Sequence, residues 1–154
     1  MADAAADALG LQHCEVLDIT YEDEISKEGI GRIGRLTHKM SLTDMAQHCK
    51  KAFAIDSVRV YGESDTEIET VAIVPGSGKD YIDIALAKKA DVFITGDIGH
   101  HNGLDALEQG LSIIDAGHYG VEKLFVPYME EFFANQMPDL TVVKAVQGNP
   151  FFVI

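Results

Sequence analysis

The apolar and polar residues in the first half of the chain are arranged in several short elements. Short apolar runs bounded by glycine and charged residues predict strands, while an apolar spacing of three and four predicts a helix. The strands are expected over residues 11–19, 31–40 (an edge or hairpin strand) and 57–62, the helix over 41–53, and a charged connection over 20–34. Ser41 and Asp44 favour a helix start, because a hydroxyl at the N-cap satisfies a free N–H group. The Ala-rich residues 1–11 are also helix-like.

From residue 70 onward, one unit recurs three times: an apolar run, a glycine-containing turn and a helical segment. The runs are VAIV, DVFITG and SIIDAG, and helices are expected over residues 81–90, over 104–110 and from 118 to about 137. The apolar segments LTVVKAV and FFVI close the chain. This alternation is typical of α/β proteins. We predict a single α/β domain, residues 1–154, with a mixed, largely parallel sheet and the three units in residues 70–137.

Charge and composition narrow the classes of function. The net charge of −13 argues against a nucleic-acid partner, because phosphate binding needs a basic surface. No apolar run approaches the roughly 20 residues that a membrane helix needs, and no signal peptide is visible. Cys14 and Cys49 are far apart in sequence, which favours a reducing compartment. We therefore expect a cytoplasmic protein without a membrane or nucleic-acid partner.

Three loops follow the predicted strands of the repeated unit, over residues 75–80, 96–103 and 115–122. In α/β sheets, function gathers where the strands end. His118 and Glu122 are four residues apart on a predicted helix and therefore share one face. An imidazole and a carboxylate together suit zinc, manganese or iron.

Each of these motifs also has a purely structural interpretation. His118 and Glu122 are compatible with a surface pair, preceded by an Asp115 that caps the helix or orients the histidine. In the loop after ITG, Asp97 is either a helix cap or a functional residue, and one of its two histidines faces the crevice or both face solvent. PGSGKD, residues 75–80, is a tight turn or an anion-binding turn, but its spacing is not that of a Walker A loop.

Four motifs occur in order: GIGRIGRL, PGSGKDYI, DVFITGDIGHH and IIDAGHYGVEK. Together they resemble the GTP cyclohydrolase type 2-like proteins, also called NGG-interacting-factor-three-like dinuclear metal centre proteins. The resemblance implies an α/β fold, a ring-like and usually hexameric homo-oligomer, and two bridged metal ions per subunit. It places metal-ligand roles on His118 and Glu122 and puts His101 near the metals, where His101 and Asp97 are the catalytic candidates.

The sequence also departs from the family pattern. Family members carry a His-His-Pro motif and a His-Thr-Asn-Leu-Asp motif that supply further ligands, and neither occurs here. The chain therefore resembles the C-terminal half of the family. Two ligands from one helix hold a metal weakly, since tight sites usually have three or four.

Three functions follow as hypotheses. The first is a metal-dependent hydrolase of the GTP cyclohydrolase type 2-like class that acts on a nucleotide or another small molecule, using one or two divalent ions. The second is a non-catalytic oligomeric scaffold or interaction module. The third is a phosphate-sensing module that uses PGSGKD. Only the first predicts metal-dependent turnover of a nucleoside triphosphate.

Overall fold

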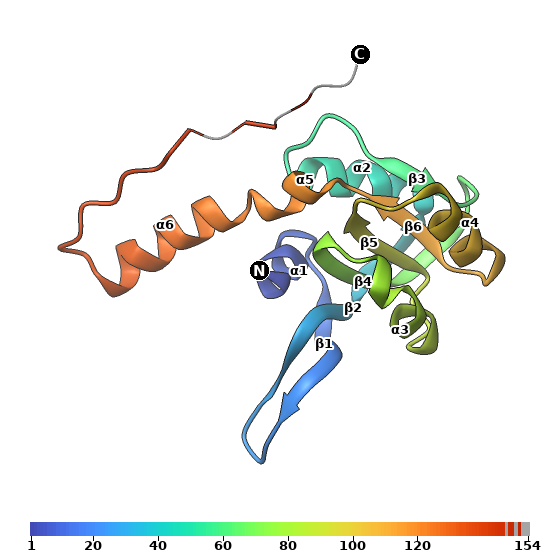
Figure 1. Cartoon of the computed structure of the whole chain (residues 1–154), viewed down its shortest axis with the longest axis horizontal. Coiled ribbons are helices and arrows are strands. Elements are labelled where there is room, and N and C mark those ends of the chain that lie inside the picture. The colour runs from blue at the N-terminus through green and yellow to red at the C-terminus, as the bar shows by residue number, and fades with distance from the viewer. Residues whose placement is uncertain (147, 150, 152–154) are drawn as a thin grey trace.

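Six strands form one mixed sheet in the computed structural model, which describes residues 1–146, 148, 149 and 151 (Figure 1). They are β1 (Gln12–Glu22), β2 (Lys27–Ser41), β3 (Arg59–Tyr61), β4 (Glu67–Ser77), β5 (Val92–Gly96) and β6 (Ser112–Asp115). Their spatial order is β1-β2-β4-β5-β6-β3. Strands β4, β5 and β6 run parallel, whereas the pairings of β1 with β2, β2 with β4 and β3 with β6 are antiparallel. The predicted α/β fold with a mixed sheet is confirmed. Its parallel part is confined to the repeated unit, and three of the five strand pairings are antiparallel, so the sheet is less parallel than predicted.

Helices cover both faces of this sheet. They are α1 (Ala2–Ala8), α2 (Leu42–Ala52), α3 (Ile82–Ala87), α4 (His100–Glu108), α5 (His118–Glu122) and α6 (Phe125–Gln136), with a 3-10 turn η1 (Lys79–Tyr81) before α3. Buried residues of α1, α2 and α5 pack with Val71 and Ile73 of β4. Those of α3 and α4 pack with the alternate residues Ala72 and Val74. Successive residues of a strand point to opposite faces, so β4 contributes to two separate apolar cores.

Several predicted elements have the expected type. Helix α2 begins after Ser41, whose hydroxyl accepts a hydrogen bond from the Asp44 N–H at 3.1 Å. Strands β3 to β6 lie where the apolar runs predict them, and α1 occupies the Ala-rich start. In the part of the chain that the structure describes, no helix is long and apolar enough to cross a membrane.

The first hairpin differs from the prediction. Residues 20–34 are mostly strand rather than a connection, because β1 continues to Glu22 and β2 starts at Lys27. Strand β2 lies between β1 and β4, so it is a hairpin strand and not an edge. The glycines make this close pairing possible: a Cβ on Gly29 would lie 1.9 Å from the carbonyl oxygen of Asp18.

The last part of the chain also differs. The long helix expected from 118 is divided at Lys123 and Leu124 into α5 and α6, and the helix expected over 104–110 begins already at His100. Residues 141–146, which include most of LTVVKAV, form no strand. Of FFVI, residues 152–154 lie outside the described residues.

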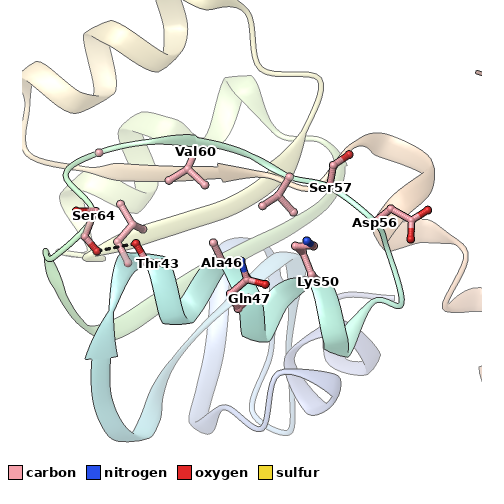
Figure 2. A pocket seen from close by; sticks show the side chains of 11 residues that line it. Thr43, Ala46, Gln47, Lys50, Asp56, Ser57, Val60 and Ser64 are labelled. Atoms are coloured by element: carbon pink, nitrogen blue, oxygen red, sulfur yellow. Dashed lines mark hydrogen bonds between the residues drawn. The ribbon is translucent and has the colours of Figure 1, made fainter. Parts of the chain in front are cut away.

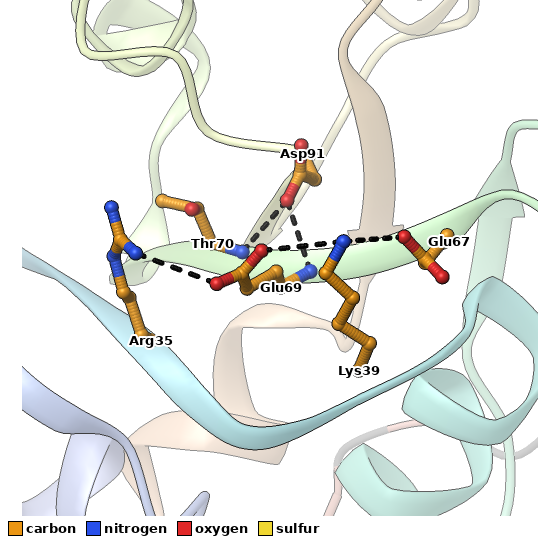
Figure 3. A network of polar contacts seen from close by, with 6 residues as sticks. All are labelled: Arg35, Lys39, Glu67, Glu69, Thr70 and Asp91. Atoms are coloured by element: carbon orange, nitrogen blue, oxygen red, sulfur yellow. Dashed lines mark hydrogen bonds and ion pairs between the residues drawn. The ribbon is translucent and has the colours of Figure 1, made fainter.

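A polar network joins the beginnings of the parallel strands (Figure 3). One oxygen of Asp91, just before β5, accepts hydrogen bonds from the backbone N–H groups of Glu69 and Thr70 at 2.9 and 2.7 Å. Arg35 and Lys39 of β2 pair with carboxylates of β4, including Glu69. Exposed ion pairs of this kind contribute little to stability, about 0–1 kcal/mol each. The hydrogen bonds from Glu69 and Thr70 to Asp91 tie the start of β5 to β4. They support the register of these two parallel strands, whose carboxyl ends lie side by side at the opposite edge.

Candidate metal-binding site

Three loops meet at the carboxyl edge of the parallel strands. Gly76 lies near the end of β4, Asp97 directly follows β5, and His118 follows β6 at the start of α5. Because the three strands are parallel and adjacent, their ends face the same edge. The sequence correctly places these loops together.

His118 lies between two carboxylates. Its Nδ1 is 2.8 Å from Oδ2 of Asp97, and its Nε2 is 3.2 Å from Oε1 of Glu122, one turn later in α5. All three side chains are about half exposed, at 48%, 54% and 49% for His118, Asp97 and Glu122. The hydrogen bond to Asp97, together with the negative charges of both carboxylates, raises the pKa of His118 above its ordinary value of 6.5.

A glycine leaves space beside these donor atoms. Gly76 has φ +77°, and a Cβ at this position would lie 2.7 Å from Oε1 of Glu122 and 3.3 Å from Nε2 of His118. A side chain here would therefore displace the carboxylate. The absence of one keeps the imidazole nitrogen and the carboxylate oxygen accessible from the β4 side.

Backbone geometry aims Asp97 at the histidine. Asp97 adopts a left-handed conformation with φ +59°, which asparagine and aspartate tolerate better than most residues. The N-cap of α4 is Gly99, so Asp97 does not cap that helix. Its carboxylate instead contacts Nδ1 of His118. The sequence indicated that Asp97 is functional or a cap but gave no signal for this contact.

The buried carboxylate of Asp115 holds the two loops together. It accepts hydrogen bonds from the backbone N–H groups of Ile98 at 3.1 Å and Gly117 at 3.0 Å. Arg59 of β3 donates to the carbonyl oxygen of Ile98 at 3.1 Å and lies 3.8 Å from Asp115. Asp115 thus holds the loops that carry Asp97 and His118. Among the described residues, no hydrogen bond or ion pair joins it to the imidazole. Nothing in the sequence pattern pointed to Arg59.

The two histidines of α4 contact each other. His100 and His101 are exposed, and their rings meet edge to face with centroids 5.5 Å apart. Among the described residues, no hydrogen bond or ion pair joins His101 to His118. His101 lies in the first turn of α4, at the same edge of the sheet.

The turn PGSGKD packs closely against the core. Thr95 Oγ1 donates a hydrogen bond to the carbonyl oxygen of Gly76 at 3.2 Å. A Cβ on Gly78 would lie 2.3 Å from the same Thr95 oxygen. Close packing against Thr95 accounts for Gly78, which favours the tight-turn interpretation over an anion-binding turn.

The donors fit part of a metal site. Nε2 of His118 and Oε1 of Glu122 converge, and a carboxylate on the opposite ring nitrogen is the usual way to orient a metal-binding histidine. Over residues 1–146, 148, 149 and 151, no group of three or more His, Cys, Asp or Glu is arranged to hold an ion. The chain therefore presents two candidate ligands and one orienting carboxylate.

A separate groove of about 390 Å³ lies between α2 and the segment that leads through β3 (Figure 2). Its walls include Ala46 and Lys50 of α2 and Val58 and Val60 opposite them. It shares no residue with the cluster around His118.

Comparisons with known proteins agree with this architecture. The chain is 39% identical over 137 residues to a GTP cyclohydrolase 1 type 2 homolog of Listeria monocytogenes, covering 86% of this chain and 36% of the relative. It is 40% identical over 131 residues to a homolog of the same name from Halalkalibacterium halodurans, covering 82% and 35%. The chain thus spans about a third of the length of these curated relatives.

Solved structures show the same fold. A Bacillus cereus protein related to NIF3 has a TM-score of 0.83 at 21% identity, covering 99% of this chain and 69% of that protein. Reduced HcgD from Methanocaldococcus jannaschii has a TM-score of 0.69 at 28% identity, covering 88% and 51%. The family Duf34/NIF3 (NGG1p interacting factor 3) matches residues 1–150, and the chain belongs to this family.

Proposed function

We propose that this chain supplies part of the ligand set of a divalent metal site, with His118 Nε2 and Glu122 as ligands. The observation that carries the proposal is the 3.2 Å approach of these two donors beside a glycine that leaves room for an ion. Zinc, manganese and iron suit this imidazole–carboxylate pair. One or two ions would bind once the remaining ligands are supplied by water or by other polypeptide.

Asp97 has a positioning role in this proposal. Its hydrogen bond to Nδ1 fixes the ring orientation and leaves Nε2 as the nitrogen that faces the ion. His101 stays our candidate for proton transfer, since it lies in a helix that starts at the same edge of the sheet.

The proposed activity is metal-dependent hydrolysis. A bound divalent ion supplies Lewis-acid polarisation and a more acidic water. The names of the relatives, GTP cyclohydrolase 1 type 2 homolog, support a nucleotide such as GTP as the substrate class. We propose a cytoplasmic location, which is compatible with the two free cysteines Cys14 and Cys49.

One observation favours a second candidate, a non-catalytic scaffold that binds metal weakly or not at all. The described residues bring together only two ligand candidates, whereas catalytic zinc sites usually have three protein ligands. The two candidates differ in one measurable respect, because only the hydrolase turns over a nucleoside triphosphate in a metal-dependent way.

Metal binding is tested directly on chelator-free protein. Elemental analysis gives the metal content per chain, and titration with Co²⁺ gives an absorption spectrum that reports nitrogen and oxygen ligands. We expect His118→Ala and Glu122→Gln to lose most of the bound metal while circular dichroism stays unchanged. The matched control is His38→Ala, which removes an exposed histidine of β2. Equal metal content in all four proteins would refute the assignment of these ligands.

A further inference from the structure

A second, polar pocket lies at the edge of the sheet opposite the cluster around His118. It has a volume of about 300 Å³, and residues of β1, β2 and β4 together with the end of α3 form its walls. The pocket reaches Thr70 near the start of β4, whereas His118 follows the carboxyl end of β6. The two places share no residue, so this pocket is not part of the proposed metal centre.

The register of the strands explains why polar side chains gather in this pocket. Glu15 of β1 pairs with Ile33 of β2. Arg35, two residues further along β2, pairs with Thr70 of β4 and lies beside it (Figure 3). Because residues two apart in a strand share a face, these side chains lie on the face where Ile33 packs with α3. Lys88, the C-cap residue of α3, forms a further wall.

His13 reaches the pocket through an irregular part of β1. The pairing of β1 with β2 shifts register between Gln12 and Glu15, and His13 has a φ of +53° there. A left-handed conformation is uncommon for a residue with a side chain, and a bulge redirects the side chains around it. Strain of this kind is concentrated at ligand-binding sites, where it positions a functional group.

The pocket gathers basic groups in a chain whose net charge is −13. Lys88 donates a hydrogen bond to the carbonyl oxygen of Val16 at 2.7 Å, which positions the ammonium group without neutralising its charge. Among the residues that the structure describes, neither Lys88 nor His13 forms an ion pair. Arg35 contacts Glu69 through one guanidinium nitrogen at a long 3.4 Å, and its other N–H groups can donate elsewhere. The pocket therefore offers positive charge and hydrogen-bond donors to a ligand.

We propose that this pocket binds a sugar phosphate, that is, a phosphomonoester that also carries hydroxyl groups. Lys88 and Arg35 bind the phosphoryl group, whose charge of about −1.5 to −2 at pH 7 matches two cations better than a carboxylate does. The Thr70 hydroxyl and the His13 ring supply further hydrogen-bond donors. The carboxylate of Glu15 would repel a bare anion, but it accepts hydrogen bonds from the hydroxyl groups of a sugar.

The size and the walls of the pocket favour a sugar phosphate over a nucleotide. Small-molecule sites range from about 300 to 1,000 Å³, so this pocket is at the lower limit. The described residues that line it include no Phe, Tyr or Trp, whereas proteins usually hold a nucleotide base by stacking it on such a ring. The net charge of −13 disfavours polymeric nucleic acid.

Calorimetric titration of the full chain with ribose 5-phosphate tests the proposal. The protein is freed of metal and the chelator is then removed, so His118→Ala should bind the probe like the wild type. We expect a dissociation constant of about 1 mM or lower, and binding at least about tenfold weaker for ribose. Lys88→Gln and Arg35→Gln should each raise the dissociation constant about tenfold, because each removes a charge-assisted hydrogen bond.

Lys89→Gln and Lys39→Gln are the matched controls. Lys89 is the exposed neighbour of Lys88, and Lys39 lies in β2 with Arg35 and also pairs with Glu69. Neither control residue lines the pocket. Both variants should bind ribose 5-phosphate like the wild type, and circular dichroism should show that all variants are folded. The comparison separates contact with the ligand from a general loss of positive charge.

Several results would overturn the proposal. One is the absence of binding up to about 10 mM ribose 5-phosphate. Another is equal weakening in the control variants, which would indicate unspecific charge attraction. Tighter binding of adenosine 5′-monophosphate than of ribose 5-phosphate would replace the sugar phosphate by a nucleotide. Glu15→Gln should lower the preference for ribose 5-phosphate over inorganic phosphate, and an unchanged preference would overturn the assignment to a hydroxylated ligand.

Discussion

Substituting Gly76 by alanine should have two effects that can be measured separately. Backbone strain lowers the free energy of unfolding, and the new side chain lowers the affinity of the proposed metal site. At φ +77°, an L-residue pays about 1–2 kcal/mol for the left-handed conformation. Alanine also restricts the unfolded chain, which stabilises the folded state by about 0.4–1 kcal/mol and offsets part of this strain. The free energy of unfolding should therefore fall by about 1 kcal/mol. The new Cβ would also lie 2.7 Å from Oε1 of Glu122, the far end of a flexible side chain that moves aside at small further cost.

The movement of the Glu122 carboxylate should weaken metal binding. With Glu122 turned away from His118, the two donors no longer converge, and we expect the affinity for Co²⁺ or Zn²⁺ to fall about 10- to 100-fold, as for other changes that misplace a ligand. Urea unfolding in EDTA measures the stability, and a competitive Zn²⁺ titration measures the affinity. The free energy of unfolding and the metal affinity are thus measured in independent experiments.

Gly10 provides the control for Gly76. It has a similar φ of +69°, but a Cβ there would meet no atom within 4 Å. Gly10→Ala should show a stability loss close to that of Gly76→Ala and wild-type metal affinity. If Gly76→Ala binds metal as tightly as Gly10→Ala does, then the space beside Glu122 is not used by an ion, and the reasoning is wrong.

Three further outcomes follow. Asp97→Asn should lower the pKa of His118, which NMR measures in metal-free protein. In the wild type, the raised pKa of His118 stabilises the folded state at pH values below the unfolded pKa of 6.5. This stabilisation is lost as the pH rises through the pKa of the folded state. Ser41→Ala should cost about 1 kcal/mol in urea unfolding, because its hydroxyl caps α2. A thiol reagent should modify exposed Cys14 and spare Cys49 in native protein, since burial raises the pKa of Cys49 to about 12.

The elements most predictable from sequence are those with local causes. The Ser41 cap specifies where α2 begins, and apolar runs followed by glycine turns specify β4, β5 and β6. The pair formed by His118 and Glu122 is predictable because four residues is one helical turn, a relation that no distant contact changes.

The first hairpin was less predictable because its pairing is not local. Charged residues such as Glu22 and Lys27 suggest a loop when they are considered alone. They nevertheless lie in strands, since the pairing of β1 with β2 extends to Glu22 and Lys27 and leaves both side chains exposed to solvent. Here the hydrogen bonds between strands override local composition.

The role of Asp97 was hidden for a different reason. An aspartate after a strand and before a helix usually caps the helix, and the sequence does not show the left-handed turn that points its carboxylate to His118. The contacts of Arg59 with Ile98 and Asp115 were equally hidden. Arg59 lies in the edge strand β3, and Ile98 lies in a loop 39 residues later in the sequence. Such contacts are properties of the folded sheet.

The packing of α5 explains why the proposed metal site is half open. One side of the site is held by the fold, because Asp115 bonds to the backbone just before α5 and Val121 is buried in the core. The backbone that carries His118 and Glu122 is therefore fixed, while about half of each side chain faces outwards. A zinc ion usually has four ligands and finds two here. Its remaining ligands have to approach from the exposed side, where water or another polypeptide has access. Affinity in the isolated chain therefore depends both on the convergence of the two donors and on what completes the site.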